Sequence, residues 1–527
     1  MLKVLVAEKI AEGGIELLKK EFDVDVITGL TPDELIAAIP AYDGLIVRSA
    51  TKATREVIEA GVKLKIVGRA GVGVDNVDVQ AATERGVIVC NAPTSNIVSA
   101  AEHTIALMLA QARNIPQANA SMHACKWERS KFTGTEVLDK TLGIVGLGRI
   151  GALVAERARG LGMKVVAYDP YVTEERAAQM GIELVYSLEE LLPKIDFLTV
   201  HLPKTKETIG MFGPDEFAAM KDGIRLINTA RGGIYQEAAL IDALTRGKVA
   251  SAGVDVYEKE PCTESPLFAF EQVIVTPHLG ASTEEAQDRA GEQIAAYVAA
   301  GLRGEMVSTA VNIAPVAPEV MEKVRPFIAL AEGLGKALAQ VVSGPLTNLE
   351  VSFIGHLAEL DTRVLKTAVL KGLLTHVTQD SVNFVNANYL AEQRGITMNE
   401  QRKPESFDYL SVIHVRALTD DGPVDIGATL VGKKNEPRII EMFDFELDMT
   451  PSEHMLFLRY GDVPGVIGTV GTVLGSEGIN IGSMQVGRTE AGGIALMGVT
   501  IDSPLSQEIL DRITAEAGID AAWSVEL

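Results

Sequence analysis

Short apolar runs alternate with helical patterns over the first 280 residues of the chain. From residue 1 to about 95 the apolar runs are KVLVAE, FDVDVITG, GLIVRSA, LKIVGRAG and VIVCNAP, with helical patterns such as PDELIAAI and TREVIEA between them. From about 140 to 280 the rhythm returns in TLGIVG, KVVAYD, DFLTVHLP, RLINTA, SAGVDV and VIVTPH. Buried strands alternating with helices are typical of βαβ units, so the pattern predicts two consecutive α/β domains, each on a doubly wound parallel sheet.

Between these two regions, NIVSAAEHTIALMLAQARNIPQANASM (96–122) predicts one long, mostly apolar helix that bridges the two sheets. α/β proteins bind ligands beside such a connection, at the carboxyl ends of their strands. We therefore expect the functional site near this helix.

The second half of the chain has a different pattern. Proline-rich NIAPVAPEV (312–320) marks a boundary, after which helical patterns (FIALAEGLGKALAQVV, TRVLKTAVLKGLLTHV) and strands (SVIHVRAL, VDIGATLVG, IIEMFDFEL) predict an α+β domain. The last 73 residues read as strand MLFLRY, helix PGVIGTVGTVLGSEG, strands INIGSMQVG and GIALMGVTID, helix SQEILDRITAEAG and strand AAWSVEL. This βαββαβ order predicts a small ferredoxin-like domain.

Composition narrows the class of protein. The 527-residue chain is long enough for three or four domains, and its formal net charge of −23 argues against nucleic acids or anionic membranes as partners. The opening run MLKVLVAEKIAEGG is too short for a secretory signal, and SAAEHTIALMLAQA, with Glu102 and His103, falls short of a membrane span. We therefore expect a cytoplasmic protein.

The cysteines predict neither a disulfide framework nor a zinc site. Cys90, Cys125 and Cys262 are an odd number and lack CxxC spacing. We expect reduced thiols, and the sequence predicts no metal site.

One segment carries a dinucleotide-binding pattern. In TLGIVGLGRIGALVAERARGLGMKVVAYDP, Gly146, Gly148 and Gly151 stand at G-x-G-x-x-G spacing between a strand and a helix, and Asp169 ends the next strand. The glycines permit a tight turn, close approach of the pyrophosphate and close helix packing, with the phosphates at the helix N-terminus. Asp169 suits the ribose hydroxyls of NAD and would repel the extra phosphate of NADP, so the pattern predicts NAD.

Three more strand ends in the same region carry candidate catalytic groups. They are NTARGG (228–233), GVDVYEKEP (253–261) and VTPHLGAST (275–283). Arg231 can bind a carboxylate through two hydrogen bonds, His278 can exchange a proton, and Glu260 can hold the imidazole. Taken singly, each has a structural alternative: a surface ion pair for Arg231, a solvated loop charge for Glu260 and a strand-end histidine for His278.

Basic residues of the first domain suit an anionic substrate. Arg48 in VRSATK and Arg69 in VGRAGVGVDNVD stand at strand ends, and Gly71 with Val72 offers backbone N–H groups for a carboxylate. KWERSKF (126–132) adds Lys126, Arg129 and Lys131 beside a tryptophan, although this run is equally typical of a basic surface loop with a packed tryptophan.

The order of the motifs carries a family resemblance. GLGRIG, the Asp169 strand end, HLPKT, NTARGG, DVYEKEP and TPHLGAST follow one another as in the D-isomer-specific 2-hydroxyacid dehydrogenase family, whose long, regulated members the chain resembles throughout. The resemblance implies NAD-dependent oxidation of 3-phospho-D-glycerate to 3-phosphohydroxypyruvate, the first step of phosphorylated serine biosynthesis. It implies a flavodoxin-like substrate domain (1–97 and 283–314), a Rossmann NAD domain (98–282), an intervening α+β domain (315–452) and an ACT domain (453–527).

The resemblance also implies roles for individual residues. Arg231 anchors and polarises the 2-oxo acid, His278 is the acid and base, and Glu260 pairs with His278. Around NAD, Asp255 contacts the nicotinamide carboxamide, and the remaining cofactor contacts come from Arg149, Ile150, His201, Pro203 and Thr229.

Further implied residues surround the substrate. The substrate-side residues that the resemblance implies are Arg48, Ser49, Arg69, Gly71, Val72, Ser95 and Asn96. In the resembling enzymes the region of Arg129 and Lys131 reaches toward a neighbouring subunit's active site. The minimal active unit would then be a dimer, and we expect a homotetramer.

The tail resembles ACT regulatory domains, which pair across subunits and bind amino acids. By this resemblance Tyr460, Asp462 and Asn480 hold serine as a feedback effector. From the sequence alone Asp462 is equally well explained as a helix N-cap before Pro464.

Two other functions fit parts of the pattern. A related dehydrogenase could act on hydroxypyruvate, glyoxylate, lactate or 2-oxoglutarate, but Arg48, Arg69 and the regulatory tail argue against it. A catalytically inactive NAD sensor of the same fold has no need of a proton-transfer pair, so His278 and Glu260 argue against that alternative.

Overall fold

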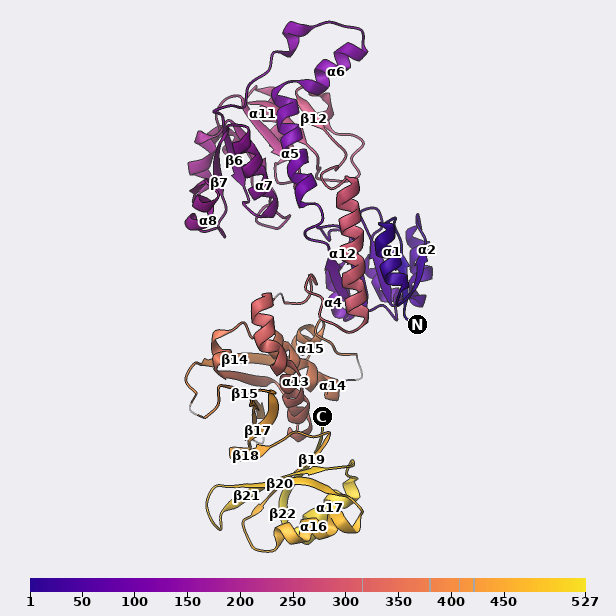
Figure 1. The fold of residues 1–527 in the computed structure, drawn as a ribbon, viewed down its shortest axis with the longest axis vertical. Coiled ribbons are helices and arrows are strands. Elements are labelled where there is room, and N and C mark those ends of the chain that lie inside the picture. Colours follow the sequence, from indigo (N-terminus) through magenta and orange to yellow (C-terminus); the bar gives the residue numbers. More distant parts are fainter. Residues whose placement is uncertain (315, 379–380, 407, 420–421) are drawn as a thin grey trace.

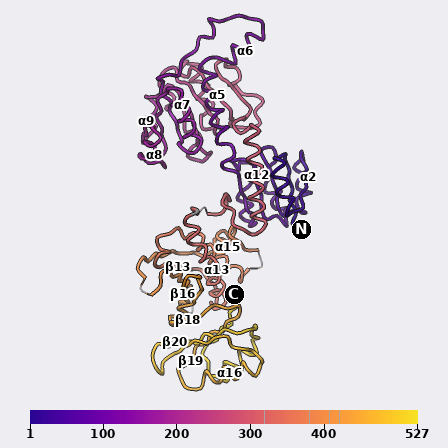
Figure 2. Tube along the Cα trace, viewed as in Figure 1, coloured from indigo at the N-terminus to yellow at the C-terminus, as the bar shows by residue number. Residues whose placement is uncertain are grey.

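The computed structural model describes residues 1–314, 316–378, 381–406, 408–419 and 422–527. In these residues four sheets, each with its own helices, follow one another along the long axis of the molecule (Figure 1). The seven-stranded sheet lies at one end and the C-terminal sheet at the other, as the Cα trace also shows (Figure 2). The domain boundary predicted at residue 315 lies outside the described residues.

The first sheet is parallel, with five strands in the order β2-β1-β3-β4-β5. The strands are β1 Lys3–Val6, β2 Asp23–Val26, β3 Gly44–Val47, β4 Ile66–Arg69 and β5 Ile88–Asn91. Its helices are α1 Glu12–Lys19, α2 Pro32–Ala38, α3 Arg55–Ala60, α4 Val79–Glu84 and, from much later in the chain, α12 Glu284–Leu302, which packs on α1 and β4. This is the flavodoxin-like order, so the predicted fold of the first domain is confirmed.

The second sheet is also parallel, with seven strands in the order β12-β11-β10-β9-β6-β7-β8. The strands are β6 Thr141–Val145, β7 Lys164–Tyr168, β8 Glu183–Val185, β9 Phe197–Val200, β10 Ile224–Asn228, β11 Val249–Val254 and β12 Val273–Val275. Its helices are α7 Arg149–Gly160, α8 Glu174–Gln179, α9 Leu188–Leu191, α10 Pro214–Ala219 and α11 Glu237–Thr245. The strand order reverses between β6 and β9, which is where open α/β sheets bind their ligands.

The long helix predicted over residues 96–122 is wrong in one respect, because the structure has two helices there. α5 Ile97–Ala112 ends before Asn114, whose φ of 51° is left-handed, and α6 Ile115–His123 starts with proline in its first turn. A left-handed residue breaks the helical hydrogen-bond ladder, and the proline at position 116 fits the first turn of a new helix. α5 packs against α7, β10 and β11, so it belongs to the core of the second sheet.

The third sheet is mixed, with the order β14-β13-β15-β16-β17-β18. The strands are β13 Asn348–Gly355, β14 Thr397–Lys403, β15 Ser411–Thr419, β16 Gly422–Val431, β17 Glu436–Met442 and β18 Phe445–Met449, with helices α13 Pro318–Val341, α14 Arg363–Val377 and α15 Ala387–Gln393. The single strand predicted over IIEMFDFEL is wrong, because Phe443 and Asp444 have φ of 52° and 62° and turn the chain into a hairpin. Two successive residues with positive φ are the geometry of a tight β-turn.

The C-terminal sheet is antiparallel, with the order β20-β21-β19-β22. Strands β19 His454–Gly461, β20 Ile481–Arg488, β21 Ile494–Ile501 and β22 Ile519–Glu526 carry helices α16 Val466–Ser476 and α17 Gln507–Ala517 on one face. The predicted βαββαβ order is confirmed. Gln340 of α13 joins this sheet to the preceding domain, since its side chain donates to Glu526 O at 2.8 Å and accepts from Glu526 N at 2.9 Å.

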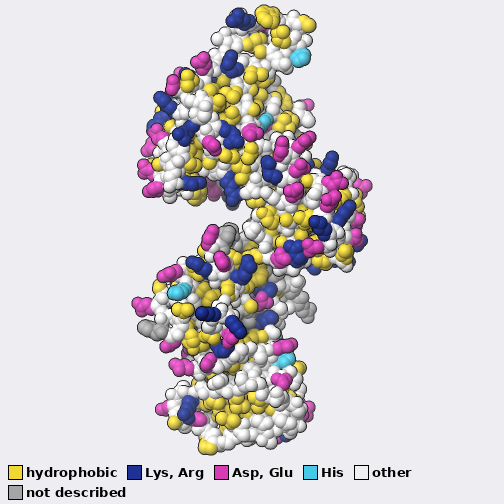
Figure 3. All heavy atoms as spheres, viewed as in Figure 1, with side chains coloured by type: hydrophobic (Ala, Val, Ile, Leu, Met, Phe, Trp, Pro, Cys, Tyr) yellow, Lys and Arg dark blue, Asp and Glu magenta, His cyan; other side chains and the backbone are white. Residues whose placement is uncertain are grey.

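The face of the molecule seen in Figure 3 carries side chains of both charges. Within the described residues, every helix is too short or too polar to traverse a lipid bilayer. Cys90 is buried, Cys125 is exposed and Cys262 is half-buried, and all three thiols are free.

Candidate active site at the junction of the two parallel sheets

The glycine-rich turn joins β6 to α7. Gly146 has φ of 94°, and a Cβ there would lie 2.6 Å from the carbonyl oxygen of His201. A Cβ on Gly151 would lie 2.1 Å from the carbonyl oxygen of Gly146, whereas a Cβ on Gly148 would meet nothing within 4 Å. Internal packing thus requires two of the glycines, and the third faces open space above the start of the helix, where a pyrophosphate fits.

Asp169 is tied to the same turn. Its carboxylate accepts from Leu147 N at 2.7 Å and from Tyr171 N at 2.9 Å. Arg149 and Ile150 form the first turn of α7, directly after its N-cap Gly148. The carboxylate therefore lies beside the turn that would hold the pyrophosphate, as a contact to the adenosine ribose requires.

His201 and Pro203 follow β9, the strand next to β6. Burial lowers the pKa of His201 to about 4, so the ring is neutral at physiological pH, and its Nε2 lies 3.2 Å from Thr199 Oγ1. The carbonyl of Pro203 accepts from Thr208 Oγ1 at 2.6 Å. A neutral, half-buried ring is compatible with lining an adenine.

His278 and Glu260 form a pair, with Nδ1 2.7 Å from Oε2. Burial opposes ionisation of Glu260, but hydrogen bonds from His278 and from Tyr257 N lower the pKa of its carboxyl. An ionised Glu260 accepts a hydrogen bond from Nδ1–H of His278, so Nε2 is the ring nitrogen left to exchange a proton with a ligand. His278 has φ of 56°, an uncommon conformation for a residue other than glycine and one that occurs often at functional sites.

Asp255 holds the His278 loop in place. The carboxylate is fully buried and accepts from Thr276 Oγ1 at 2.5 Å, Leu279 N at 2.7 Å and Gly280 N at 2.9 Å. Its carbonyl accepts from His278 N at 3.0 Å. The structure therefore shows Asp255 as the support of this loop, a role additional to the expected nicotinamide contact.

His103 of α5 contacts the same carboxylate and was missed as a site residue in the sequence. Its Nε2 lies 3.3 Å from Asp255 Oδ1 and 3.2 Å from Thr276 Oγ1. Burial opposes ionisation of Asp255, but hydrogen bonds from His103, Thr276 and Leu279 lower its pKa. Thr229 also contacts α5, through a 2.7 Å hydrogen bond to Thr104. The one signal in the sequence was a histidine in a mostly apolar helix.

Arg231 lies at the junction of the first two domains. Its Nε is 3.5 Å from Asp75 Oδ2, and a Cβ on Gly73 would lie 2.3 Å from its guanidinium. Burial lowers the pKa of Arg69 to about 10, and the charge of Arg231 contributes to the shift. Two guanidinium groups from different domains thus lie near enough for their charges to interact, which suits a ligand with anionic groups.

The first domain arranges its basic loop through fixed hydrogen bonds. Glu8 accepts from Arg48 N and Thr51 N, both at 2.8 Å, and Arg69 donates to Ser49 Oγ at 3.2 Å. A Cβ on Gly71 would lie 2.2 Å from Arg69, so the glycine gives the guanidinium its space. Arg48, Ser49, Arg69 and Gly71 are therefore brought together.

The NAPTSN segment adds a group without a protein partner. Asn96 Oδ1 is buried and has no hydrogen-bond partner among the described residues. Ser95 is buried and donates to Ala92 O at 2.9 Å, while the carbonyl of Val72 accepts from Asn91 Nδ2 at 2.5 Å. The Asn96 oxygen is thus available for a ligand, whereas the Ser95 hydroxyl is already used.

Within one chain, Arg129 and Lys131 do not lie at the junction of the first two domains. They lie in the 3₁₀ turn Arg129–Phe132 after α6, at the outer end of the second domain (Figure 1). Lys131 Nζ is 3.7 Å from Glu271 Oε2, and Trp127 is 81% exposed rather than packed.

The expected effector residues lie in the C-terminal domain. Tyr460 is 3% exposed, and Asn480 Nδ2 donates to Asp502 at 2.9 Å. Asp462 accepts from Gly492 N at 3.1 Å and lies 3.4 Å from Arg488. The alternative role of Asp462 as a helix N-cap is wrong, because Gly465 is the N-cap of α16.

Three family models match the chain in succession. They are the D-isomer specific 2-hydroxyacid dehydrogenase NAD binding domain over residues 105–280, the D-3-phosphoglycerate dehydrogenase intervening domain over residues 323–443 and the ACT domain over residues 454–518.

Curated relatives match over the full length. The chain is 45% identical to D-3-phosphoglycerate dehydrogenase of Synechocystis over 528 aligned residues, covering 100% of this chain and 95% of the relative. It is 48% identical to the Mycobacterium tuberculosis protein of the same name, covering 99% and 98%. Among solved structures, D-lactate dehydrogenase of Aquifex aeolicus, complexed with NAD and lactic acid, matches with a TM-score of 0.52 and 27% identity over 57% of this chain and 96% of that one.

Proposed function

Because the chain belongs to the D-3-phosphoglycerate dehydrogenases of the D-isomer-specific 2-hydroxyacid dehydrogenase family, we propose that it oxidises 3-phospho-D-glycerate to 3-phosphohydroxypyruvate with NAD. The observation that carries the proposal is the 2.7 Å His278–Glu260 pair, and the electrostatic proximity of Arg231 to Arg69 supports it. In this role the enzyme opens the phosphorylated route to serine.

We propose that four parts of the chain divide this work. Residues 1–97 and 283–314 bind the substrate, and residues 98–282 bind NAD. Residues 315–452 form the intervening domain, and residues 453–527 form the ACT domain. The packing of α12 on α1 and β4 supports the return of the chain to the substrate domain.

The chemistry follows from the groups at the junction. NAD, when bound, accepts the hydride that leaves C2 of the substrate. Nε2 of His278 accepts the hydroxyl proton, and the ionised Glu260 stabilises the imidazolium that results. Arg231 binds the carboxylate and polarises the developing carbonyl oxygen, while Arg48 and Arg69 bind the phosphate.

The cofactor site fits NAD. Gly148 leaves open space at the start of α7, and the Asp169 carboxylate lies beside the turn. Arg149, Ile150, His201, Pro203, Thr229 and Asp255 complete the proposed contacts. The negative charge of Asp169 disfavours the 2′-phosphate of NADP.

An assay of NADH formation tests the function. Purified protein with NAD and 3-phosphoglycerate at alkaline pH should produce NADH, and His278→Ala should abolish it. Glyoxylate, hydroxypyruvate, lactate and 2-oxoglutarate, each tested in its reactive direction, should give far lower kcat/KM. No NADH from the wild type, or equal NADH from the variant, would refute the mechanism.

We also propose an oligomer, with a dimer as the minimal active unit and a tetramer as the assembled form. Exposed apolar groups near α6 support it, since Ile115 and Met122 are each 54% exposed beside Trp127. In such a dimer Arg129 and Lys131 reach the partner's substrate site. Light scattering gives the mass of the assembly, and a monomeric active enzyme would contradict the proposal.

Feedback by serine is proposed for the ACT domain, with Tyr460, Asp462 and Asn480 as effector residues. Serine must bind two global states of the enzyme differently for such control to exist. Initial rates measured against serine test it, and a flat response at millimolar serine contradicts it. The cytoplasmic location expected from the sequence stays a prediction.

A further inference from the structure

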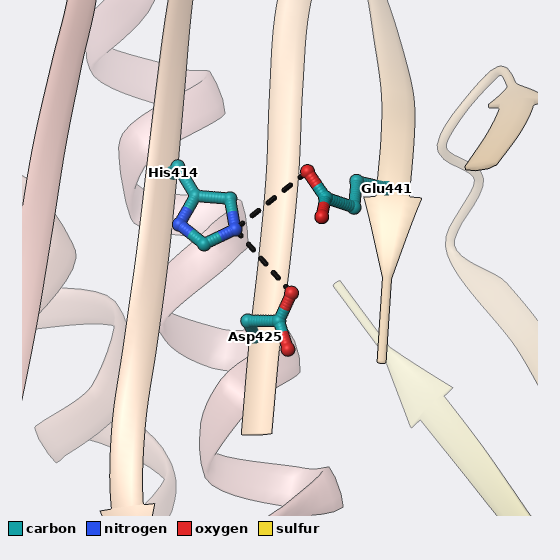
Figure 4. A group of neighbouring side chains, drawn as sticks. All are labelled: His414, Asp425 and Glu441. Atoms are coloured by element: carbon teal, nitrogen blue, oxygen red, sulfur yellow. Dashed lines mark hydrogen bonds and ion pairs between the residues drawn. The ribbon is translucent and has the colours of Figure 1, made fainter. Parts of the chain in front are cut away.

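Three ligand-type side chains meet on one face of the third sheet, far from the dehydrogenase site. His414 of β15, Asp425 of β16 and Glu441 of β17 point toward one another from adjacent strands, with helices on the opposite side of the sheet (Figure 4). His414 Nε2 is 3.3 Å from Asp425 Oδ2 and 3.7 Å from Glu441 Oε2. Within the described part of the chain, this is the one group of three or more histidine, cysteine, aspartate or glutamate side chains with such close spacing.

The register of the strands explains why the three side chains converge. Gly427 of β16 is the pairing partner of His414 on one side and of Glu441 on the other. A Cβ at this glycine would lie 3.3 Å from His414 Cδ2 and 3.2 Å from Glu441 Cβ. Since the middle strand has no side chain there, the outer two can meet across it, and Asp425, two residues away, lies on the same face.

A bulge gives the cluster its final geometry. The pairing of β16 with β17 shifts register between Gly427 and Ala428, and that of β17 with β18 shifts between Ile439 and Glu441. Bulges change the direction of a side chain and often occur next to functional sites. Glu441 is thereby directed at His414.

One oxygen of the buried carboxylate has no partner. Asp425 is 2% exposed, and its Oδ1 has no hydrogen-bond partner among the described residues. A buried carboxylate oxygen without a partner costs free energy, and bound cations satisfy such groups. Glu446, the cross-strand partner of Glu441, adds a further carboxylate to this part of the sheet.

We propose that His414, Asp425 and Glu441 bind a divalent transition-metal cation, with Zn²⁺ as the best match. In a tetrahedral site with bonds of about 2.1 Å, neighbouring ligand atoms lie about 3.4 Å apart, close to the two spacings observed here. One imidazole and two carboxylates suit zinc, whereas calcium and magnesium prefer all-oxygen sets of six or more ligands. The exposed side of Glu441 leaves the fourth position to water.

The competing arrangement is a plain ion-pair triad, in which a protonated His414 bridges both carboxylates. Arg416, the cross-strand partner of Asp425, adds a positive charge to this face, and its Nε is buried without a hydrogen-bond partner among the described residues. The two arrangements differ in their affinity for metal, because an ion-pair triad does not bind a divalent cation.

Metal titration of the full-length, untagged protein tests the site. After removal of metal with a chelator, Co²⁺ should bind with a stoichiometry of one per chain and produce the visible absorption of a tetrahedral site, and Zn²⁺ should displace it. His414→Gln and Glu441→Gln should lose this signal. His376→Gln, which changes an exposed histidine on α14 of the same domain, should keep it.

Folding controls distinguish the loss of a ligand from the loss of the fold. Circular dichroism of the metal-free proteins shows whether the variants retain the fold, and Gly427→Ala supplies a second variant that crowds the cluster but leaves all three ligands. Gly427→Ala should weaken Co²⁺ binding about tenfold or more. The proposal is overturned if the wild type binds no Co²⁺ at micromolar concentrations, or if folded His414→Gln binds it equally well.

Discussion

Arg231 of the NAD-binding domain lies against Asp75 of the first domain, with Nε 3.5 Å from Oδ2. Burial lowers the pKa of Arg69, and the nearby charge of Arg231 adds to this shift. The carboxylate of Asp75 therefore neutralises part of the positive charge of Arg231, which the substrate's anionic groups would otherwise meet in full. This contact links the two domains at the point where the substrate should bind.

Substitutions at this contact should separate binding from catalysis. Arg231→Lys loses the planar fork that binds a carboxylate, so kcat/KM for 3-phosphoglycerate should fall by about 100-fold. Asp75→Asn removes the competing carboxylate, so KM should fall with kcat nearly unchanged. Steady-state kinetics check both, with Asp33→Asn, an exposed acid on α2, as the matched control. A rise in KM for Asp75→Asn would contradict the interpretation.

The His278–Glu260 pair predicts a change in pH dependence. In Glu260→Gln the protonated ring loses its charged partner, so the acid limb of the pH–kcat profile should move to lower pH by about one unit, with kcat itself reduced. Glu260→Asp, which keeps the charge, should restore part of the wild-type profile. An unchanged acid limb in Glu260→Gln would show that the carboxylate does not act on the ring.

The same pair contributes to stability over a defined pH range. Folding lowers the pKa of Glu260, so the pair stabilises the native state above the unfolded-state pKa. This contribution is lost as the pH falls through the lower, folded-state value. Thermal unfolding of wild type and Glu260→Gln should therefore differ at neutral pH and converge in acid.

The glycine turn predicts different effects for glycine-to-alanine substitutions at the two ends of α7. Gly148→Ala meets no protein atom within 4 Å, so the fold should remain while the new methyl group occupies space needed by the pyrophosphate. NADH binding, followed by fluorescence, should weaken by about tenfold or more. Gly160→Ala, at the far end of α7 and equally free of contacts, is the control and should bind NADH normally.

Local pattern was enough to predict the sheets and the glycine turn. β6, the turn at Gly146 and α7 are contiguous, so the spacing of glycines and apolar residues determines them directly. The exceptions are local too. The helix over residues 96–122 divides at left-handed Asn114, and the strand over IIEMFDFEL divides at Phe443 and Asp444, although neither position is a glycine.

Contacts between distant parts of the chain could not be predicted in this way. His103 reaches Asp255 only because α5 packs on β11, and Arg231 reaches Asp75 only because the two domains meet. The ligands at 414, 425 and 441 share no motif spacing, because the hairpin register of three strands brings them together. Such sites depend on tertiary packing, which a linear pattern does not encode.

Asp169 predicts the cofactor preference. Its carboxylate accepts from two backbone N–H groups beside the glycine turn, and its charge should repel a 2′-phosphate. Asp169→Asn keeps an acceptor for the turn but removes the charge, so the ratio of kcat/KM for NADP to that for NAD should rise by about tenfold. An unchanged ratio would place the discrimination on other residues.

The three free thiols should differ in reactivity, since alkylation requires an accessible thiolate. Cys90 is 0% exposed, and burial raises the pKa of its thiol, whereas Cys125 is exposed and Cys262 is half-buried. Iodoacetamide labelling of the folded protein, read by peptide mass spectrometry, should modify Cys125 and Cys262 well before Cys90. In guanidinium chloride all three should react, which controls for peptide detection. Labelling of Cys90 at the rate of Cys125 in the folded protein would mean that the first sheet opens far more readily than its buried core implies.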